Sequence, residues 1–217
     1  MKIIFHLHTN YSTDSNLSLD EITRRCKKDR VECLIVTDHN NIEGAKKLKK
    51  IAPFKIVIGE EINTSHGEII GLFLKSKIKP DLSPEKTITE IKKQGGLVVI
   101  PHPFDWFRRS TLKRSVLEKI LPDIDIFETF NGRCLFNSFN QKSVSFARQK
   151  KIKQIVGPDA HFAQELSLSF IKMPEFDGAK NFLKNLDRAK FYNEKSPFIF
   201  TLRTIIFKLK KKITKLF

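Results

Sequence analysis

Residues 1–9, MKIIFHLHT, place two histidines directly after a short apolar run. Five later apolar runs lead in the same way to imidazole or carboxylate side chains. The residues that follow the six runs are His6, His8, Asp38, His39, Glu61, His102, Glu128, Asp159 and His161. Apolar runs separated by helical patterns are typical of parallel strands in α/β proteins, whose functional side chains lie at the carboxyl ends of the strands. The pattern therefore predicts one site with several metal ligands.

The number of predicted strands favours a barrel. Residues 68–74 (EIIGLFL) are a further candidate strand and residues 167–171 another, which brings the count to about seven or eight. That number suits a closed or distorted (β/α) barrel. An open doubly wound sheet is the alternative, but such sheets concentrate function at a switch point and would not unite six strand ends in one site. We therefore expect an α/β fold of the barrel type.

Helix signals lie between the apolar runs. Ser18, with Glu21 three residues later, forms a candidate capping box and predicts the start of the first helix. Ser83 followed by Pro84 predicts the start of another helix, which should stop at the two glycines 95–96. Residues 137–150 and 175–186 are further helix candidates.

Length and charge limit the organisation and the partners. A chain of 217 residues that is 40% hydrophobic can form one barrel domain, which we place at residues 1–200. Residues 201–217 (TLRTIIFKLKKKITKLF) form a separate tail with six basic side chains and no acidic one. The net charge of +16 favours anionic partners such as nucleic acid, phosphorylated metabolites or acidic lipid.

The three cysteines include no CxxC pair, which favours a reducing compartment. The first residues lack the pattern of a signal peptide, and no apolar run is long enough to span a bilayer. We therefore expect a cytoplasmic protein without a transmembrane segment.

The spacing of the ligand-type residues indicates a polynuclear metal site. His6 and His8 are two residues apart in an extended segment, so both side chains project from one face and can bind one ion. Asp14 in the next loop adds a carboxylate. The candidate ligands are His6, His8, Asp14, His39, Glu61, His102, Glu128, Asp159 and His161. They are too many for one tetrahedral zinc and suit two or three ions of zinc, manganese or iron. Asp38 is expected to hold the His39 region by hydrogen bonding.

Six short motifs resemble the PHP family, which is named for polymerase and histidinol phosphatase domains. In chain order they are HLHT, TDHN, GEEI, PHP, ETFNGR and PDAH, over about residues 1–165. The resemblance implies a distorted (β/α)7 barrel with two or three metals at its carboxyl face, and usually phosphoester hydrolysis. It also implies that the nine candidate ligands bind metal.

The chain departs from the family pattern at two positions. Many relatives have aspartate where this chain has Ile4, so a partner that orients a metal ligand is expected to be missing. Many also carry histidine near the position of Glu68, which leaves Glu68 either a ligand or a solvated charge. His66 is interpreted as a turn histidine, with a substrate or metal contact as the alternative.

The ligand set predicts a mechanism. Two cations close together would lower the pKa of a bridging water, and the resulting hydroxide would attack phosphorus in line with the leaving group. We assign catalytic roles to Asp159, His161 and Arg133. Candidate substrate contacts are Arg133, Arg108, Arg109 and Asn131, the arginines because a guanidinium can bind phosphate through two hydrogen bonds.

Trp106 with Phe104 and Phe107 could form a stacking platform, but packing under a loop is favoured slightly.

The apolar residues of the tail recur at helical spacing, which predicts a basic amphipathic helix. We expect residues 202–209 to dock their apolar stripe on the barrel; the last turns are too cationic to be mainly core and leave contact with an anionic membrane or nucleic acid open.

Three functions fit the sequence as a whole. The first is a metal-dependent phosphoesterase acting on a small phosphorylated metabolite or short nucleotide. A nuclease and a non-catalytic metal-binding or interaction module are the alternatives, although no nucleic-acid-binding domain is recognisable.

Overall fold

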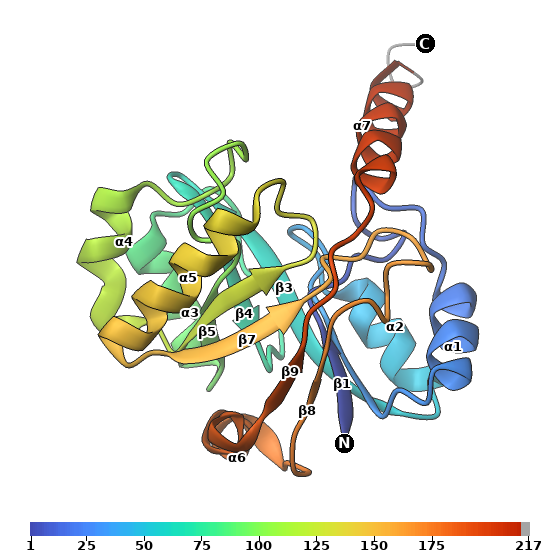
Figure 1. Cartoon of the computed structure of the whole chain (residues 1–217), viewed down its shortest axis with the longest axis horizontal. Helices are drawn as coiled ribbons and strands as arrows, with labels where there is room; N and C mark the ends of the chain where they lie inside the picture. Colours follow the sequence, from blue (N-terminus) through green and yellow to red (C-terminus); the bar gives the residue numbers. More distant parts are fainter. Residues whose placement is uncertain (214–217) are drawn as a thin grey trace.

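Strands and helices alternate through most of the chain (Figure 1). The computed structural model describes the backbone of residues 1–213 and the side chains of residues 1–211. The strands are β1 (Lys2–Phe5), β2 (Cys33–Val36), β3 (Lys55–Thr64), β4 (Gly67–Leu72), β5 (Leu97–Ile100), β6 (Ile126–Asn131), β7 (Lys153–Gly157), β8 (Phe170–Lys172) and β9 (Lys190–Tyr192). The α-helices are α1 (Leu19–Lys28), α2 (Glu43–Ile51), α3 (Pro84–Lys93), α4 (Arg114–Ile120), α5 (Asn137–Lys150), α6 (Gly178–Asn185) and α7 (Phe198–Ile213).

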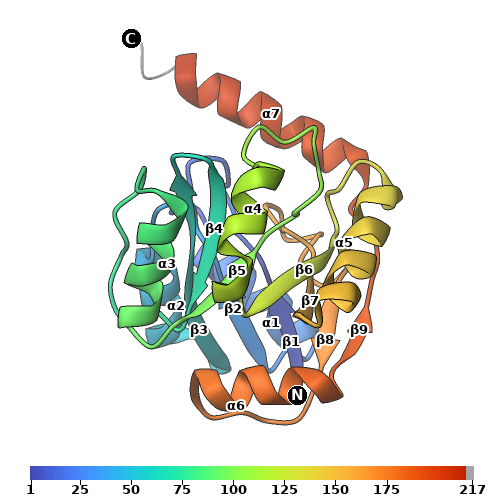
Figure 2. The ribbon, with the colours of Figure 1, turned by 90° about the vertical axis from the view of Figure 1, so that its left-hand side faces the viewer.

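One sheet runs through the whole fold in the order β7-β6-β5-β4-β3-β2-β1-β8-β9. Strands β1, β2 and β3 are parallel, as are β5, β6 and β7, while β4 is antiparallel to both of its neighbours. β8 and β9 extend the sheet beyond β1. Helices α1 to α5 pack outside the sheet, and the result is the nearly closed, distorted α/β barrel that we predicted (Figure 2).

The barrel closes just beyond the ends of β1 and β7. A parallel bridge pairs Leu7 with Ala160, where the His8 N–H donates to the Ala160 carbonyl at 2.8 Å. A side chain at Gly157 would prevent this approach, because a Cβ there would lie 2.5 Å from the carbonyl oxygen of Phe5. Closure brings the first and last ligand motifs of the sequence side by side.

Apolar side chains fill the barrel and cap its amino end. Alternate residues of the strands, such as Ile3, Phe5 and Ile35, point inwards and form one buried cluster. Phe182 of α6 and Phe176 belong to the same cluster, so α6 plugs the end of the barrel away from the metal-ligand motifs (Figure 2). The opposite end is therefore the one that carries polar side chains.

The capping signals place the helices as predicted. The side chain of Ser18 and Glu21 form the reciprocal capping box at the start of α1. Ser83 caps α3, which begins with Pro84 and ends at Lys93, and α5 has the predicted bounds.

Two expectations about the fold are corrected. The sheet has nine strands within the described residues rather than seven or eight, and the strand predicted at residues 68–74, whose direction the sequence left open, is antiparallel to its neighbours. The prediction that residues 202–209 dock their apolar stripe on the barrel is wrong, because Leu202, Ile205, Ile206 and Leu209 are 40–57% exposed. Residues 214–217 of the predicted tail lie outside the described residues.

We predict that Gly157→Ala lowers the free energy of unfolding by about 3 kcal/mol, because the new methyl group would push β7 away from β1. Thermal denaturation should show a fall in Tm of roughly 5–10 °C. Gly95→Ala is the matched control: Gly95 has a φ of +74° but no atom close to a Cβ, so it should cost only about 1 kcal/mol. A loss at position 157 no larger than at position 95 would contradict this account of closure.

Candidate metal centre

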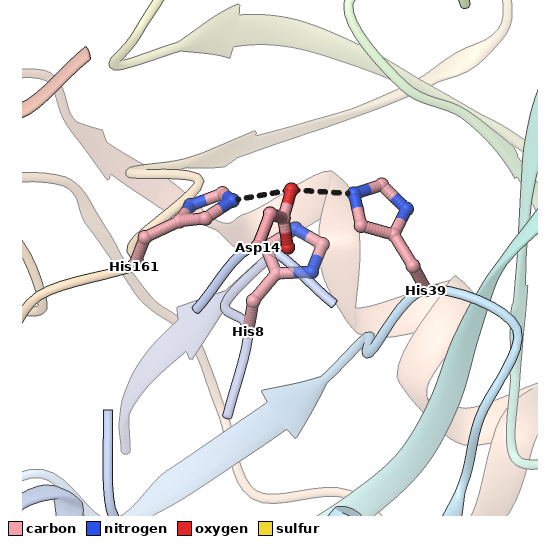
Figure 3. Close-up of side chains that lie close together, drawn as sticks. All are labelled: His8, Asp14, His39 and His161. Carbon is pink, nitrogen blue, oxygen red and sulfur yellow. Dashed lines mark ion pairs between the residues drawn. The ribbon is translucent and has the colours of Figure 1, made fainter. Parts of the chain in front are cut away.

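Six of the nine predicted ligands fall into three groups of potential metal ligands at the carboxyl end of the barrel, and Glu68 joins them. The first group joins His8, Asp14, His39 and His161 (Figure 3). Asp14 Oδ2 lies 3.2 Å from His39 Nε2 and 3.1 Å from His161 Nε2. The rings of His39 and His161 flank that of His8, with ring centroids 4.5 and 4.4 Å away. Four side chains from three distant segments thus converge on one small volume.

The second group is formed by His6, His8 and Glu61. Glu61 Oε2 lies 3.4 Å from the Nε2 atoms of both histidines. Asp159 Oδ1 is close to the same two atoms, at 3.5 and 3.2 Å. The HxH pair therefore directs both rings towards the carboxylates of Glu61 and Asp159.

Glu68 completes the third group, with His39 and Glu61. His39 Nδ1 lies 3.3 Å from Glu61 and 3.5 Å from Glu68. His102 Nε2 faces the same pair of carboxylates at 3.2 and 3.7 Å. Glu68 reaches the site because β4 is antiparallel, which puts its first residues beside the carboxyl end of β3.

The three groups share members. His8 belongs to the first and second, Glu61 to the second and third, and His39 to the first and third. Carboxylates commonly bridge neighbouring ions, and Glu61 occupies the position from which it could do so. The three groups are therefore overlapping sets of potential ligands.

The donor atoms fit divalent metals in their chemistry as well as their spacing. Four of them, His6 Nε2, His8 Nε2, His39 Nδ1 and Asp14 Oδ1, are buried and have no hydrogen-bond partner. Buried polar atoms are normally paired because leaving one unpaired costs about 1–3 kcal/mol. Imidazole nitrogen and carboxylate oxygen are ligands that zinc, manganese and iron accept, so bound ions would satisfy these atoms.

Backbone strain accompanies the ligands. His6, His102 and Asp159 have φ values of 63°, 31° and 55°, a region that side-chain-bearing residues seldom adopt. Each such residue costs on the order of 1–3 kcal/mol and persists only where its surroundings hold it. The strained residues are those that turn ligand side chains from the strand ends into the site.

Glu128, like His102 and Asp159, lies outside the three groups but contacts candidate ligands. Its Oε1 is 2.7 Å from His6 Nδ1, and its Oε2 accepts hydrogen bonds from the His102 backbone N–H and the Asn131 amide. A carboxylate on the far nitrogen of a ligating histidine fixes the ring and raises its basicity. Glu128 thus orients a candidate ligand, which Ile4 cannot do because its side chain is apolar and buried in a hydrophobic cluster.

Asp38, which we expected to hold the His39 region, forms hydrogen bonds to Thr9, the residue after the HxH motif. It accepts from the Thr9 backbone N–H at 2.6 Å and from the Thr9 hydroxyl at 2.7 Å. Gly44 makes room for this contact, because a Cβ there would lie 2.3 Å from Asp38 Oδ2. Burial raises the pKa of the Asp38 carboxyl to about 7, although the hydrogen bonds from Thr9 oppose the shift.

The predicted substrate contacts lie in different surroundings. Arg108 packs against the site, with Nη1 2.7 Å from Asp159 Oδ2 and Nη2 donating to Asn131. Asn131 is buried, and its amide also donates to Asp159. Arg109 is exposed and lines a polar pocket of 460 Å³ that includes Glu68 and His66. His66 lies in the predicted turn, where Ser65 Oγ is 2.8 Å from its Nδ1.

The guanidinium group of Arg133 is bound to Glu165 and to α7. It makes a two-pronged ion pair with Glu165, at 2.8 and 2.7 Å, and donates to Thr204 of α7 at 2.9 Å. Glu165 is fully buried and also accepts from the backbone N–H of His161. The pair therefore supports the segment that carries His161. Sequence analysis did not find Glu165, since it lies in an irregular segment without a ligand pattern.

Lysine 208, which sequence analysis did not single out, enters the site from α7. Its Nζ lies 2.9 Å from Asp14 Oδ2. Lys208 also lines a pocket of 430 Å³ together with Tyr11, His39 and Glu68. A cationic side chain therefore stands at the mouth of the metal centre. Of the three aromatic residues that we expected to pack under a loop, Phe104 is buried in a hydrophobic cluster, whereas Trp106 and Phe107 are exposed.

Residues 5–194 match the family model of the PHP domain. The chain belongs to the PHP domain family. Two proteins of Methanocaldococcus jannaschii are similar in sequence. The uncharacterized protein MJ1587 is 38% identical over 170 residues, which cover 71% of this chain and 94% of the relative. The uncharacterized protein MJ0417 is 34% identical over 180 residues, 82% of this chain and 72% of the relative.

Solved structures share the fold. PsfC from Pseudomonas syringae has a TM-score of 0.69 at 14% identity, over 96% of this chain and 98% of that one. A two-domain protein from Bacteroides vulgatus, described as containing a predicted PHP-like metal-dependent phosphoesterase, has a TM-score of 0.67 at 17% identity. That match covers 89% of this chain, which spans 65% of the two-domain protein. Within the described residues of this PHP domain, no helix has the length and apolarity needed to cross a bilayer.

Several candidate ligands of the PHP domain have shifted pKa values. Burial alone would lower the pKa of His39, but the carboxylates Glu61 and Asp14 outweigh it and raise that pKa to about 10. The pKa of His6 is also raised, because Glu128, Asp159 and Glu61 outweigh burial. Asp14 moves the other way: the neighbouring His161 and His39 outweigh burial and hold its pKa below the usual range. Protons on the His6 and His39 rings therefore offset part of the carboxylate charge at neutral pH.

We predict that metal binding releases protons, because an imidazole must be neutral to ligate an ion. Since the pKa values of His6 and His39 are raised, both rings are protonated at neutral pH, and affinity for Mn²⁺ or Zn²⁺ should rise as the pH increases. Titration calorimetry in buffers with different ionisation enthalpies measures the protons released. An observed enthalpy that does not depend on the buffer would contradict the prediction.

Proposed function

We propose that this PHP domain is a metal-dependent phosphoesterase that hydrolyses a small phosphorylated metabolite or a short nucleotide. The observation that carries the proposal is the set of three linked ligand groups around His8, His39 and Glu61. Such a set suits two or three ions of manganese, zinc or iron. Structural zinc sites use four protein ligands around one ion, whereas this centre has more donors and an open mouth.

The protein residues would divide the work between holding metal and positioning substrate. His6, His8, Asp14, His39, Glu61, Glu68, His102, Asp159 and His161 are the proposed ligands. Bound ions would supply an activated water and neutralise charge on the phosphate oxygens. Asp159 and His161 keep their proposed catalytic roles as ligands, and Glu128 orients His6. Arg133 becomes a positioning residue for the His161 segment, because Glu165 and Thr204 occupy its guanidinium group.

Two pockets beside the centre support a small substrate. They have volumes of 430 and 460 Å³, within the range of about 300–1,000 Å³ that is typical of small-molecule sites. Both include Glu68 and Asn63, so they meet at the third ligand group. Lys208 lines the first and Arg109 the second, and we propose these two cations as phosphate contacts. Arg108 and Asn131 act through Asp159, which both contact.

The proposal is tested by screening the full chain with Mn²⁺ against nucleotides, sugar phosphates and oligonucleotides. We expect phosphate release from a small substrate with little dependence on salt. Oligonucleotide cleavage that weakens steeply with salt would instead establish the nuclease function that the +16 charge allows. Metal loading without any phosphoester hydrolysis would leave a non-catalytic metal-binding module.

His161→Ala should reduce turnover to background while the chain stays folded, because it removes a ligand from the first group. Circular dichroism checks the fold, and metal analysis after gel filtration should show less metal bound per chain. His66→Ala is the control for histidine removal and should leave the metal content unchanged, since His66 lies in an exposed turn. Turnover that survives in His161→Ala would overturn the ligand assignment.

Lys208→Met should raise KM for a phosphorylated substrate about tenfold, or ~1.4 kcal/mol, with a smaller change in kcat. The reason is that Lys208 would contact the substrate rather than the reacting water. Lys211→Met removes a charge three residues further along α7 and should leave KM within about twofold. Equal effects of the two substitutions would mean that Lys208 acts only through net charge.

A further inference from the structure

The last helix has one face fixed to the barrel. Thr204 is buried and bonded to Arg133, and Lys208 reaches Asp14. The ring of Phe200 packs 5.5 Å from that of Phe162. These contacts hold α7 across the carboxyl end of the barrel, where it lies over the loops of the metal centre (Figure 2).

The opposite face of α7 is apolar and exposed. Phe198, Leu202, Ile205, Ile206 and Leu209 recur at spacings of three and four residues and therefore form one stripe. Their side chains are 40–57% exposed. Figure 1 shows the helix standing clear of the body of the fold. Monomeric soluble proteins seldom expose a continuous apolar stripe, so such a stripe marks an interaction surface.

The charge of α7 selects the kind of partner. The helix carries Arg203, Lys208 and Lys210–Lys212, with no acidic residue between Phe198 and Ile213. Arg203 and Lys210 are seven residues apart and border one edge of the apolar stripe. A helix with an apolar face bordered by lysine and arginine is typical of segments that lie in the interface of an anionic membrane. Nucleic acid would satisfy the cations but would leave the stripe in water.

We infer that α7 is an interfacial helix that binds the surface of a membrane containing anionic phospholipid. The apolar stripe inserts among the acyl chains, and the bordering cations contact lipid phosphates. Because Thr204 and Lys208 fix the other face, the membrane lies on the far side of α7 from the barrel. The metal centre then sits next to the membrane surface. The inference does not depend on the proposed function, since it concerns binding alone.

The experiment is flotation of the full chain with vesicles. We expect it to float with phosphatidylcholine mixed with phosphatidylglycerol, and to bind pure phosphatidylcholine at least about tenfold more weakly. The double variant Leu202→Asp/Ile206→Asp should lose binding by about tenfold or more, with unchanged circular dichroism. Ile51→Asp is the matched control, because Ile51 is 55% exposed at the end of α2 and away from α7, and it should float like the original chain.

Three results would overturn the inference. One is equal flotation of the double variant and the original chain. Another is failure to float while the chain binds oligonucleotides through the lysines of α7. That result would make α7 a nucleic-acid-binding helix. The third is failure to float while the original chain sediments as a dimer and the double variant as a monomer. That result would assign the stripe to a contact with a second copy of this chain.

Discussion

The structure depends on balancing charge inside a buried cluster of imidazoles and carboxylates. Parallel strands deliver these side chains to one end of the barrel, where burial removes most of the water that would otherwise solvate them. The carboxylates Glu61, Asp14 and Asp159 lie so close to the histidines that each sign stabilises the other, and several donor atoms still have no partner. Divalent ions would bind these donor atoms and offset the carboxylate charge. The strained backbone of His6, His102 and Asp159, and the second contacts of Glu128 and Asp38, have a common purpose, which is to hold ligand atoms towards one small volume.

Another buried carboxylate, that of Glu165, connects this cluster to the last helix. Glu165 accepts from the backbone of His161 and from Arg133, and Arg133 in turn binds Thr204 of α7. The hydroxyl of Ser196, just before α7, donates to the same carboxylate. One polar network therefore holds both the first turns of α7 and the candidate ligand His161. An interfacial role for α7 and a metal centre beneath it are compatible for this reason, since the helix can use its outer face without releasing its inner one.

Much of the fold could be predicted because the barrel repeats one local pattern, an apolar run followed by a ligand-type residue. Capping boxes and proline placed the helices for the same local reasons, as at Ser18 and Ser83. Glu68 stayed ambiguous because it lies at the start of an antiparallel strand, and strand direction depends on distant pairing. Glu128 follows an apolar run within β6 and Arg133 lies just beyond that strand, as ligands or substrate contacts would, yet only the fold reveals that Glu128 contacts His6 and that Arg133 pairs with Glu165. The direction of the apolar stripe of α7 was mispredicted, because periodicity defines a stripe but not the side on which the barrel lies.

The central claim is that one end of this PHP domain holds a polynuclear metal centre. Anomalous diffraction from crystals grown with Mn²⁺, measured on both sides of the manganese absorption edge, tests it most directly. The account predicts two or three anomalous peaks, each within ligand distance of one of the groups that share His8, Glu61 and His39. A single peak, or no peak among these side chains in fully loaded protein, would contradict it.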